Sequence, residues 1–114
     1  MRIETHDGYV KVWHDRPAND VPELDSILQS IDDALAAAQA TRIVFDSRES
    51  EYRGGEVQSR MWDWLQGHPR LKRVATLVKS ELLATSVNMT GVSKAVRIKA
   101  FANETQAVDW LMKV

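Results

Sequence analysis

Three segments from residue 42 onward repeat one order of patterns, and this order restricts the fold more than any other feature. In each segment a short apolar run rich in β-branched residues is followed by a stretch of helical character. The runs cover residues 42–46, 73–78 and 96–101. Strands that alternate with helices form a sheet covered by helices. The sequence therefore predicts an α/β fold with strand–helix repeats.

The first 14 residues predict an antiparallel hairpin. An Asp-Gly pair at positions 7–8 is a strong signal for a two-residue turn. This turn places Glu4 opposite Lys11, which is a favourable cross-strand charge pair. The complete sheet is therefore expected to be mixed, with an N-terminal antiparallel hairpin followed by the strand–helix repeats.

Four helices are expected, and capping residues mark the start of three of them, since Ser80 can cap the helix expected over residues 81–94. Asp20 precedes an apolar stripe with helical spacing that extends to about Ala38, and Asn103 precedes the closing helix. The other two helices are expected over residues 56–67 and 81–94. No linker or internal repeat interrupts the pattern, so residues 1–114 are predicted to be a single domain.

Composition excludes several classes of protein. The chain has no cysteine, so disulfides and thiolate metal sites are excluded, and its three histidines are too scattered in sequence to predict a metal site. The polar N-terminus does not resemble a signal peptide, and no apolar run approaches the roughly 18 residues that span a bilayer. No glycine-rich nucleotide motif is present. We therefore expect a cytoplasmic protein without a cofactor, and no nucleic-acid or membrane partner.

Charge is distributed unevenly along the chain. Residues 1–69 contain seven Lys/Arg and thirteen Asp/Glu, a net charge of −6, whereas residues 70–114 contain eight and three, a net charge of +5. Two interpretations fit this asymmetry. The charges are ordinary solvated side chains, or the second half presents a basic patch to an acidic partner.

Two sequence patterns and the order of the elements carry a family resemblance. The strand that ends Ile-Val-Phe-Asp at position 46 precedes a loop and a helix, and the chain closes with Phe101, a short turn containing Glu104, Ala107, Trp110 and Leu111. In these features, and in its order of hairpin, helix and strand–helix units, the chain resembles the SpoIIAA-like branch of STAS-type domains. That fold is shared by bacterial anti-sigma-factor antagonists and the tails of sulphate transporters.

The resemblance implies a non-enzymatic, regulatory module that docks onto a partner protein. In the antagonist subfamily, a serine at the start of the second helix is phosphorylated to break the complex. The matching region here, residues 51–56, keeps the glycines Gly54 and Gly55 but has no serine. The phosphoserine switch is therefore not carried over to this chain.

Loops after two of the predicted strands form the first candidate binding site. Parallel neighbouring strands would open both loops at one edge of the sheet, where ligands of open α/β sheets bind and where two helix N-termini favour an anion. The alternative is a set of ordinary solvated loops, with Asp46 capping the loop that follows it. The candidate residues are Asp46, Ser47, Arg48, Tyr52, Arg53, Gly54, Gly55, Lys79 and Ser80.

The helix expected at 81–94 is rich in small residues and is the second candidate site. Asn88 and Gly91 lie within it, and Gly91 costs roughly 1 kcal/mol in a helix interior, which close approach of another element could offset. That element is a neighbouring helix, a partner chain or a ligand. On the preceding helix, Trp62 and Trp64 cannot share one face, so one of them is expected near the surface.

The sequence is compatible with two functions from different classes. The first is a protein–protein interaction module with an unidentified partner, and a homodimer is compatible with it. The alternative is a carrier or sensor of a small apolar or anionic ligand. A carrier should contain a sizeable apolar cavity, whereas an interaction module should be packed solid and expose an apolar patch.

Overall fold

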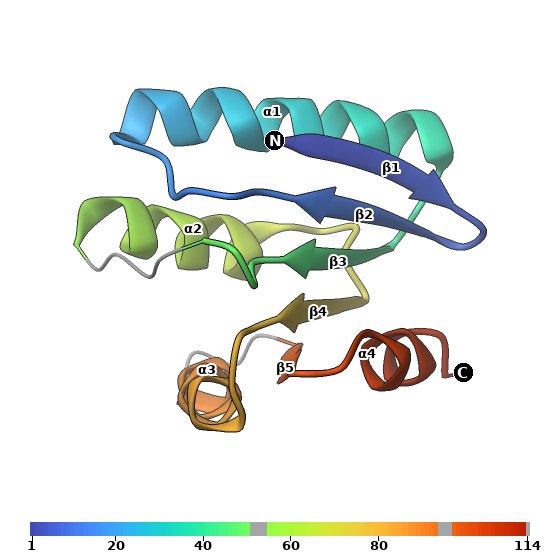
Figure 1. The fold of residues 1–114 in the computed structure, drawn as a ribbon. Helices are drawn as coiled ribbons and strands as arrows, with labels where there is room; N and C mark the ends of the chain where they lie inside the picture. Colours follow the sequence, from blue (N-terminus) through green and yellow to red (C-terminus); the bar gives the residue numbers. More distant parts are fainter. Residues whose placement is uncertain (51–54, 94–96, 114) are drawn as a thin grey trace.

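The computed structural model describes residues 1–50, 55–93 and 97–113 and contains one five-stranded sheet with four helices (Figure 1). The strands lie in the order in which they occur in the chain. This arrangement confirms the predicted α/β fold. The elements are β1 (Arg2–His6), β2 (Tyr9–Trp13), α1 (Val21–Ala38), β3 (Arg42–Asp46), α2 (Glu56–Gly67), β4 (Arg73–Leu77), α3 (Glu81–Ser93), β5 (Ile98–Phe101) and α4 (Glu104–Leu111).

The hairpin has the predicted turn and register. Strands β1 and β2 are antiparallel, and Glu4 lies opposite Lys11. Gly8 takes a φ of 88°, in the region that glycine enters without steric cost, as a tight hairpin turn requires. Each later strand pairs in parallel with the strand before it, which makes the sheet mixed.

Helices cover both faces of the sheet. On one face, α1 and α2 pack over a core that includes Val12 and Phe45, and α3 packs against β5. On the other face, α4 packs over β3, β4 and β5 through Ala107 and Leu111. Strand β3 is therefore buried on both sides, which explains why its three central residues, at positions 43–45, are all apolar instead of alternating with polar residues.

Capping residues start α1 and α4 as predicted. The carboxylate of Asp20 accepts a hydrogen bond from the backbone N–H of Glu23 at 2.8 Å. The side-chain oxygen of Asn103 accepts one from the N–H of Gln106 at 3.1 Å. Each cap satisfies a backbone donor that the helix itself leaves without a partner.

Both tryptophans of α2 are buried, so the expectation that one lies near the surface is wrong. Trp62 is 6% exposed and Trp64 is 8% exposed. Trp64 packs edge-to-face on Phe45 of the sheet, with ring centroids 6.5 Å apart, and its indole N–H donates to Asp32 of α1 at 3.4 Å. Helix α2 therefore buries more than one stripe, because both α1 and the sheet lie against it.

This packing predicts that the two tryptophans contribute similarly to stability. Trp62→Ala and Trp64→Ala should each lower the free energy of unfolding by about 3–5 kcal/mol, because each removes a large buried ring. Leu82→Ala, at an exposed position of α3, is the control and should change it by less than about 0.5 kcal/mol. Urea unfolding measures all three. Wild-type stability of the Trp62 variant would contradict the burial described here.

Candidate functional site

The loops after β3 and β4 emerge at one edge of the sheet, as predicted. The two strands are parallel neighbours, and the N–H of Ser47 donates to the carbonyl of Leu77 at 3.0 Å. Consecutive residues at the end of β3 nevertheless point to opposite faces. Phe45 packs under α1 and α2, whereas Asp46 points to the face that carries α4. The predicted edge is therefore divided into two sites.

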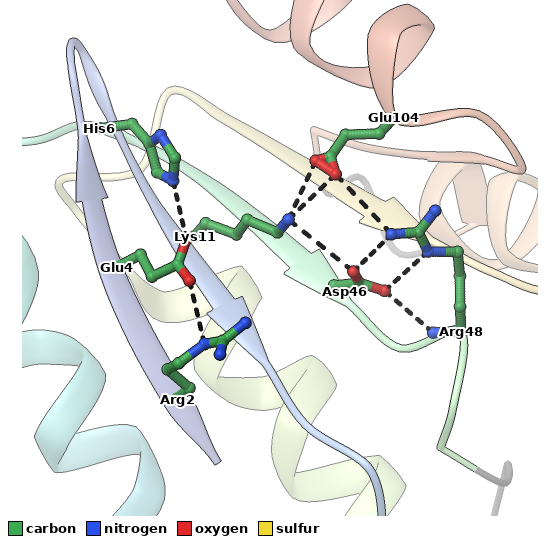
Figure 2. A network of polar contacts seen from close by, with 7 residues as sticks. All are labelled: Arg2, Glu4, His6, Lys11, Asp46, Arg48 and Glu104. Carbon is green, nitrogen blue, oxygen red and sulfur yellow. Dashed lines mark hydrogen bonds and ion pairs between the residues drawn. The ribbon is translucent and has the colours of Figure 1, made fainter.

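Asp46 is the centre of an ion-pair network on the α4 face (Figure 2). Its buried carboxylate accepts from the guanidinium of Arg48 at 2.7 and 3.0 Å and from the backbone N–H of Arg48 at 3.3 Å. Glu104 at the start of α4 accepts two hydrogen bonds from Lys11, each 3.0 Å. Two acids and two bases thus join β2, β3 and α4. The bond to the Arg48 backbone makes Asp46 a cap for the following loop, which was the alternative interpretation.

The network is charged at neutral pH and is paired internally. Hydrogen bonds from Arg48 hold the pKa of Asp46 below its usual value, and the same pair raises the pKa of Arg48. Arg48 also lies 3.7 Å from Glu104. Arg48 therefore does not converge with Lys79 on an anion site, contrary to expectation. Tyr52, Arg53 and Gly54 lie outside the described residues.

A second polar row lies beside this network on β1 and continues onto β2. The carboxylate of Glu4 pairs with Arg2 at 3.0 Å and with His6 at 3.1 Å (Figure 2). The ring of His6 stacks on Tyr9, with centroids 4.9 Å apart. Arg2 and Glu4 carry opposite charges, so the row does not form a strongly charged surface.

A cavity of about 220 Å³ lies on the opposite face, bounded by α1, α2, α3 and the ends of the strands. The helices contribute mainly apolar side chains, such as Leu28, Trp62 and Val87. Several of its polar side chains follow the carboxyl ends of strands: His14 follows β2 and Ser47 follows β3. The cavity is thus apolar toward the helices and polar toward the edge of the sheet.

His14 and Ser47 are hydrogen-bonded at this polar end. The imidazole Nε2 and the hydroxyl of Ser47 are 2.8 Å apart. Burial lowers the pKa of His14, which favours the neutral ring. Sequence reasoning missed His14 as a site residue. Its position directly after a strand that pairs in parallel with β3 was the signal that could have identified it.

A wider depression lies at the other end of the molecule, between the C-terminal parts of α1 and α2. Its walls carry charged side chains, and Asp32 among them is paired within the depression. Asp32 accepts from both His68 and Trp64, at 2.7 and 3.4 Å. Within the described residues, no three histidine or acidic side chains are grouped so that they could hold a metal ion.

The inner side of α3 is fastened to the edge strand β5. The side-chain oxygen of Asn88 accepts from the N–H of Ala100 at 2.7 Å. The carbonyls of Arg97 and Phe101 face β4, because they accept hydrogen bonds from backbone N–H groups of that strand and the residue after it. The backbone groups of successive residues in a strand point to opposite sides, so the N–H of Ala100 points away from β4. Asn88 thus occupies a donor on the open edge of the sheet, and the nearby Gly91 is also buried. The element that approaches this small-residue helix is therefore the protein's own edge strand.

The outer side of α3 exposes apolar side chains instead. Leu82 is 81% exposed, Met89 is 69% exposed and Val92 is 83% exposed. Ser80, one of the predicted edge residues, caps this helix through its hydroxyl, which accepts from the N–H of Leu83 at 3.3 Å. Lys79, immediately before it, is exposed and lies at the cavity.

The Asp46 network makes a prediction for acid unfolding. Asp46→Asn should lower the free energy of unfolding at pH 7 by about 1–3 kcal/mol, since it removes hydrogen bonds between charged groups. The pKa of Asp46 is lower in the folded protein than in the unfolded chain, where it is about 3.9. The wild-type advantage is therefore complete above that value and is lost as the pH falls through the lower folded value. Urea unfolding from pH 7 to about pH 2 measures it, with Asp109→Asn as the exposed control.

The Asn88 contact makes a separate prediction. Asn88→Ala should destabilise the protein by about 1–3 kcal/mol, because the N–H of Ala100 loses its partner. Hydrogen exchange at Ala100, followed by NMR, should become faster in this variant. Thr85→Ala, on the exposed side of the same helix, should leave that exchange rate unchanged. Equal exchange in wild type and Asn88→Ala would show that the side chain does not protect the edge.

Comparisons with known proteins identify the fold. No protein-family model matches this chain, and no curated protein matches it. It is similar to the crystal structure of an uncharacterized protein from the DUF3478 family with a SpoIIAA-like fold, from Shewanella loihica PV-4. The TM-score is 0.68 at 19% sequence identity, over 96% of this chain and 90% of that one. None of the described helices has the length and apolar composition needed to cross a membrane. The chain has a SpoIIAA-like fold, as the order of its elements and its closing helix implied.

Proposed function

We propose that this protein is a non-catalytic, STAS-like regulatory module that binds a partner protein through the outer face of α3. The observation that carries the proposal is the exposure of Leu82, Met89 and Val92 on that helix. Spacings of seven and three residues place these side chains on one side of a helix. The other side of the helix faces the protein, since Ala84 is buried there and Asn88 binds β5.

The composition of α3 suits an interface better than a solvated surface. Glu81 is its only charged residue, whereas the exposed positions of α1 include Asp25 and Asp33. The cores of protein interfaces are depleted in charge and enriched in methionine, and grouped exposed apolar side chains are typical of interaction sites.

Charge around α3 favours an acidic partner over a second copy of this chain. Lys79 precedes the helix, and Arg97 and Lys99 follow it; all three are exposed. A symmetric contact between two copies would bring like charges together, whereas a partner with carboxylates around an apolar centre would complement them. Addition of a strand to β5 is also opposed by Asn88, which already binds the open edge.

An anionic membrane fits these observations less well. Helices that lie on membranes carry Lys or Arg on their polar face. Helix α3 has neither residue type between Glu81 and Ser93. The proposal is therefore a protein partner in the bacterial cytoplasm, in keeping with the resemblance to STAS-type domains.

The test first compares the proteins captured by two double variants of this protein, used as baits, and then measures binding to a purified candidate partner. Leu82→Glu combined with Met89→Glu places two negative charges on the apolar face, so binding should weaken by more than about tenfold, which corresponds to about 1.4 kcal/mol. Gln29→Glu combined with Gln106→Glu adds the same charge at exposed positions of α1 and α4 and should leave binding unchanged. Mass spectrometry identifies the proteins lost only from the first bait, and calorimetry with the purified candidate measures the affinity.

Other outcomes would contradict the proposal. Equal capture by both baits would exclude α3 as the docking face. Sedimentation equilibrium that shows a dimer abolished by the α3 substitutions would identify a second copy as the occupant. Cosedimentation with anionic vesicles that depends on Leu82 and Met89 would identify a membrane instead.

A further inference from the structure

We propose that the cavity bounded by α1, α2 and α3 is a binding site for a small monocarboxylate with an apolar body, such as a medium-chain fatty acid. This inference is independent of the docking face. The cavity and the outer side of α3 use different residues, since Leu82 and Met89 do not line the cavity.

The lining of the cavity selects an anionic ligand. Arg16 and Lys79 belong to it, whereas none of the described lining residues is Asp or Glu, although the chain contains 16 acidic residues. Arg16 is paired with Glu23 at 2.9 Å. Lys79 has no ion-pair partner within the described part of the chain. Lys79 is therefore the cation that a ligand carboxylate would pair with.

The hydrogen-bonded pair at the strand ends supplies a second contact for the head group. Burial lowers the pKa of His14, and its ring is hydrogen-bonded to the hydroxyl of Ser47. When the imidazole donates to Ser47, the hydroxyl proton is available to a ligand oxygen. A carboxylate would thus accept from Ser47 while its charge faces Lys79, and its apolar part would point toward the helices.

The size of the cavity limits the apolar body. Sites for drug-sized ligands measure about 300–1,000 Å³, and an apolar cavity of about 150 Å³ holds benzene. The present 220 Å³ lies between these values. The space therefore fits a short or medium-length chain, or one ring with a short substituent, and is too small for a two-chain phospholipid.

Binding is measured with sodium octanoate and with 1-octanol, which has the same chain length and no charge. Trp62 lines the cavity, so its fluorescence should change in a saturable manner, and NMR should place the shifts at residues such as Val87. Octanoate should bind more tightly than octanol. Lys79→Met should weaken octanoate about two- to fivefold, the range of an exposed ion pair, and leave octanol unchanged. Lys113→Met is the control for the loss of an exposed charge.

Two filling variants test the location of the site. Val87→Phe and Ile27→Phe each place a ring in the cavity and should weaken octanoate by about tenfold or more. Val108→Phe, on α4 at the opposite face, should have no effect. Urea unfolding establishes which filling variant is folded.

Three results would overturn the proposal. The first is the absence of saturable octanoate binding to the wild type. The second is unchanged binding in a folded filling variant, and the third is tighter binding of octanol than of octanoate. Each of these results leaves the α3 docking face untouched, because its test relies on Leu82 and Met89.

Discussion

The parallel pairing of β3 with β4 is the contact on which both the Asp46 network and the cavity depend. It brings the carboxyl ends of the two strands to one edge of the sheet, where the N–H of Ser47 reaches the carbonyl of Leu77. The side-chain alternation of a strand then sends neighbouring residues to opposite faces. Asp46 enters an ion-pair network beside α4, and Ser47 lines a cavity beside His14. One register therefore positions a structural network and a candidate ligand site only one residue apart.

Helix α3 links the two proposed functions, because each of its sides has a different environment. Asn88 fastens the helix to β5, and Leu83 and Val87 line the cavity. Leu82 and Met89 face solvent. An interaction module was expected to be packed solid and to expose an apolar patch, and a carrier to contain an apolar cavity. This protein has the exposed patch on α3 and also a cavity, so it does not meet the expectation of a solidly packed interaction module. The cavity and the exposed patch thus involve different residues of the same helix.

Local rules predicted the elements with few errors. The Asp-Gly turn and the period of two of a strand determine the register of the hairpin, and the side chains of Asp20 and Asn103 mark the helix starts. The burial of Trp62 could not be predicted in this way. A helical stripe identifies one buried face, whereas α2 lies against both α1 and the sheet, so residues on two of its sides are enclosed.

The sequence by itself determined the order of strands and helices, the hairpin, the caps and the resemblance to the SpoIIAA-like fold, because each depends on residues that are close in the chain. Only the tertiary structure decided which side chains form a site. Lys11 and Glu104 are bonded although 93 positions separate them, and this network, together with Asp46, holds Arg48 away from Lys79. His14 lies beside Ser47 only because β2 and β3 are paired in parallel. The physical reason is that side-chain spacing specifies which face of an element is buried, whereas the packing of elements distant in sequence specifies what that face meets.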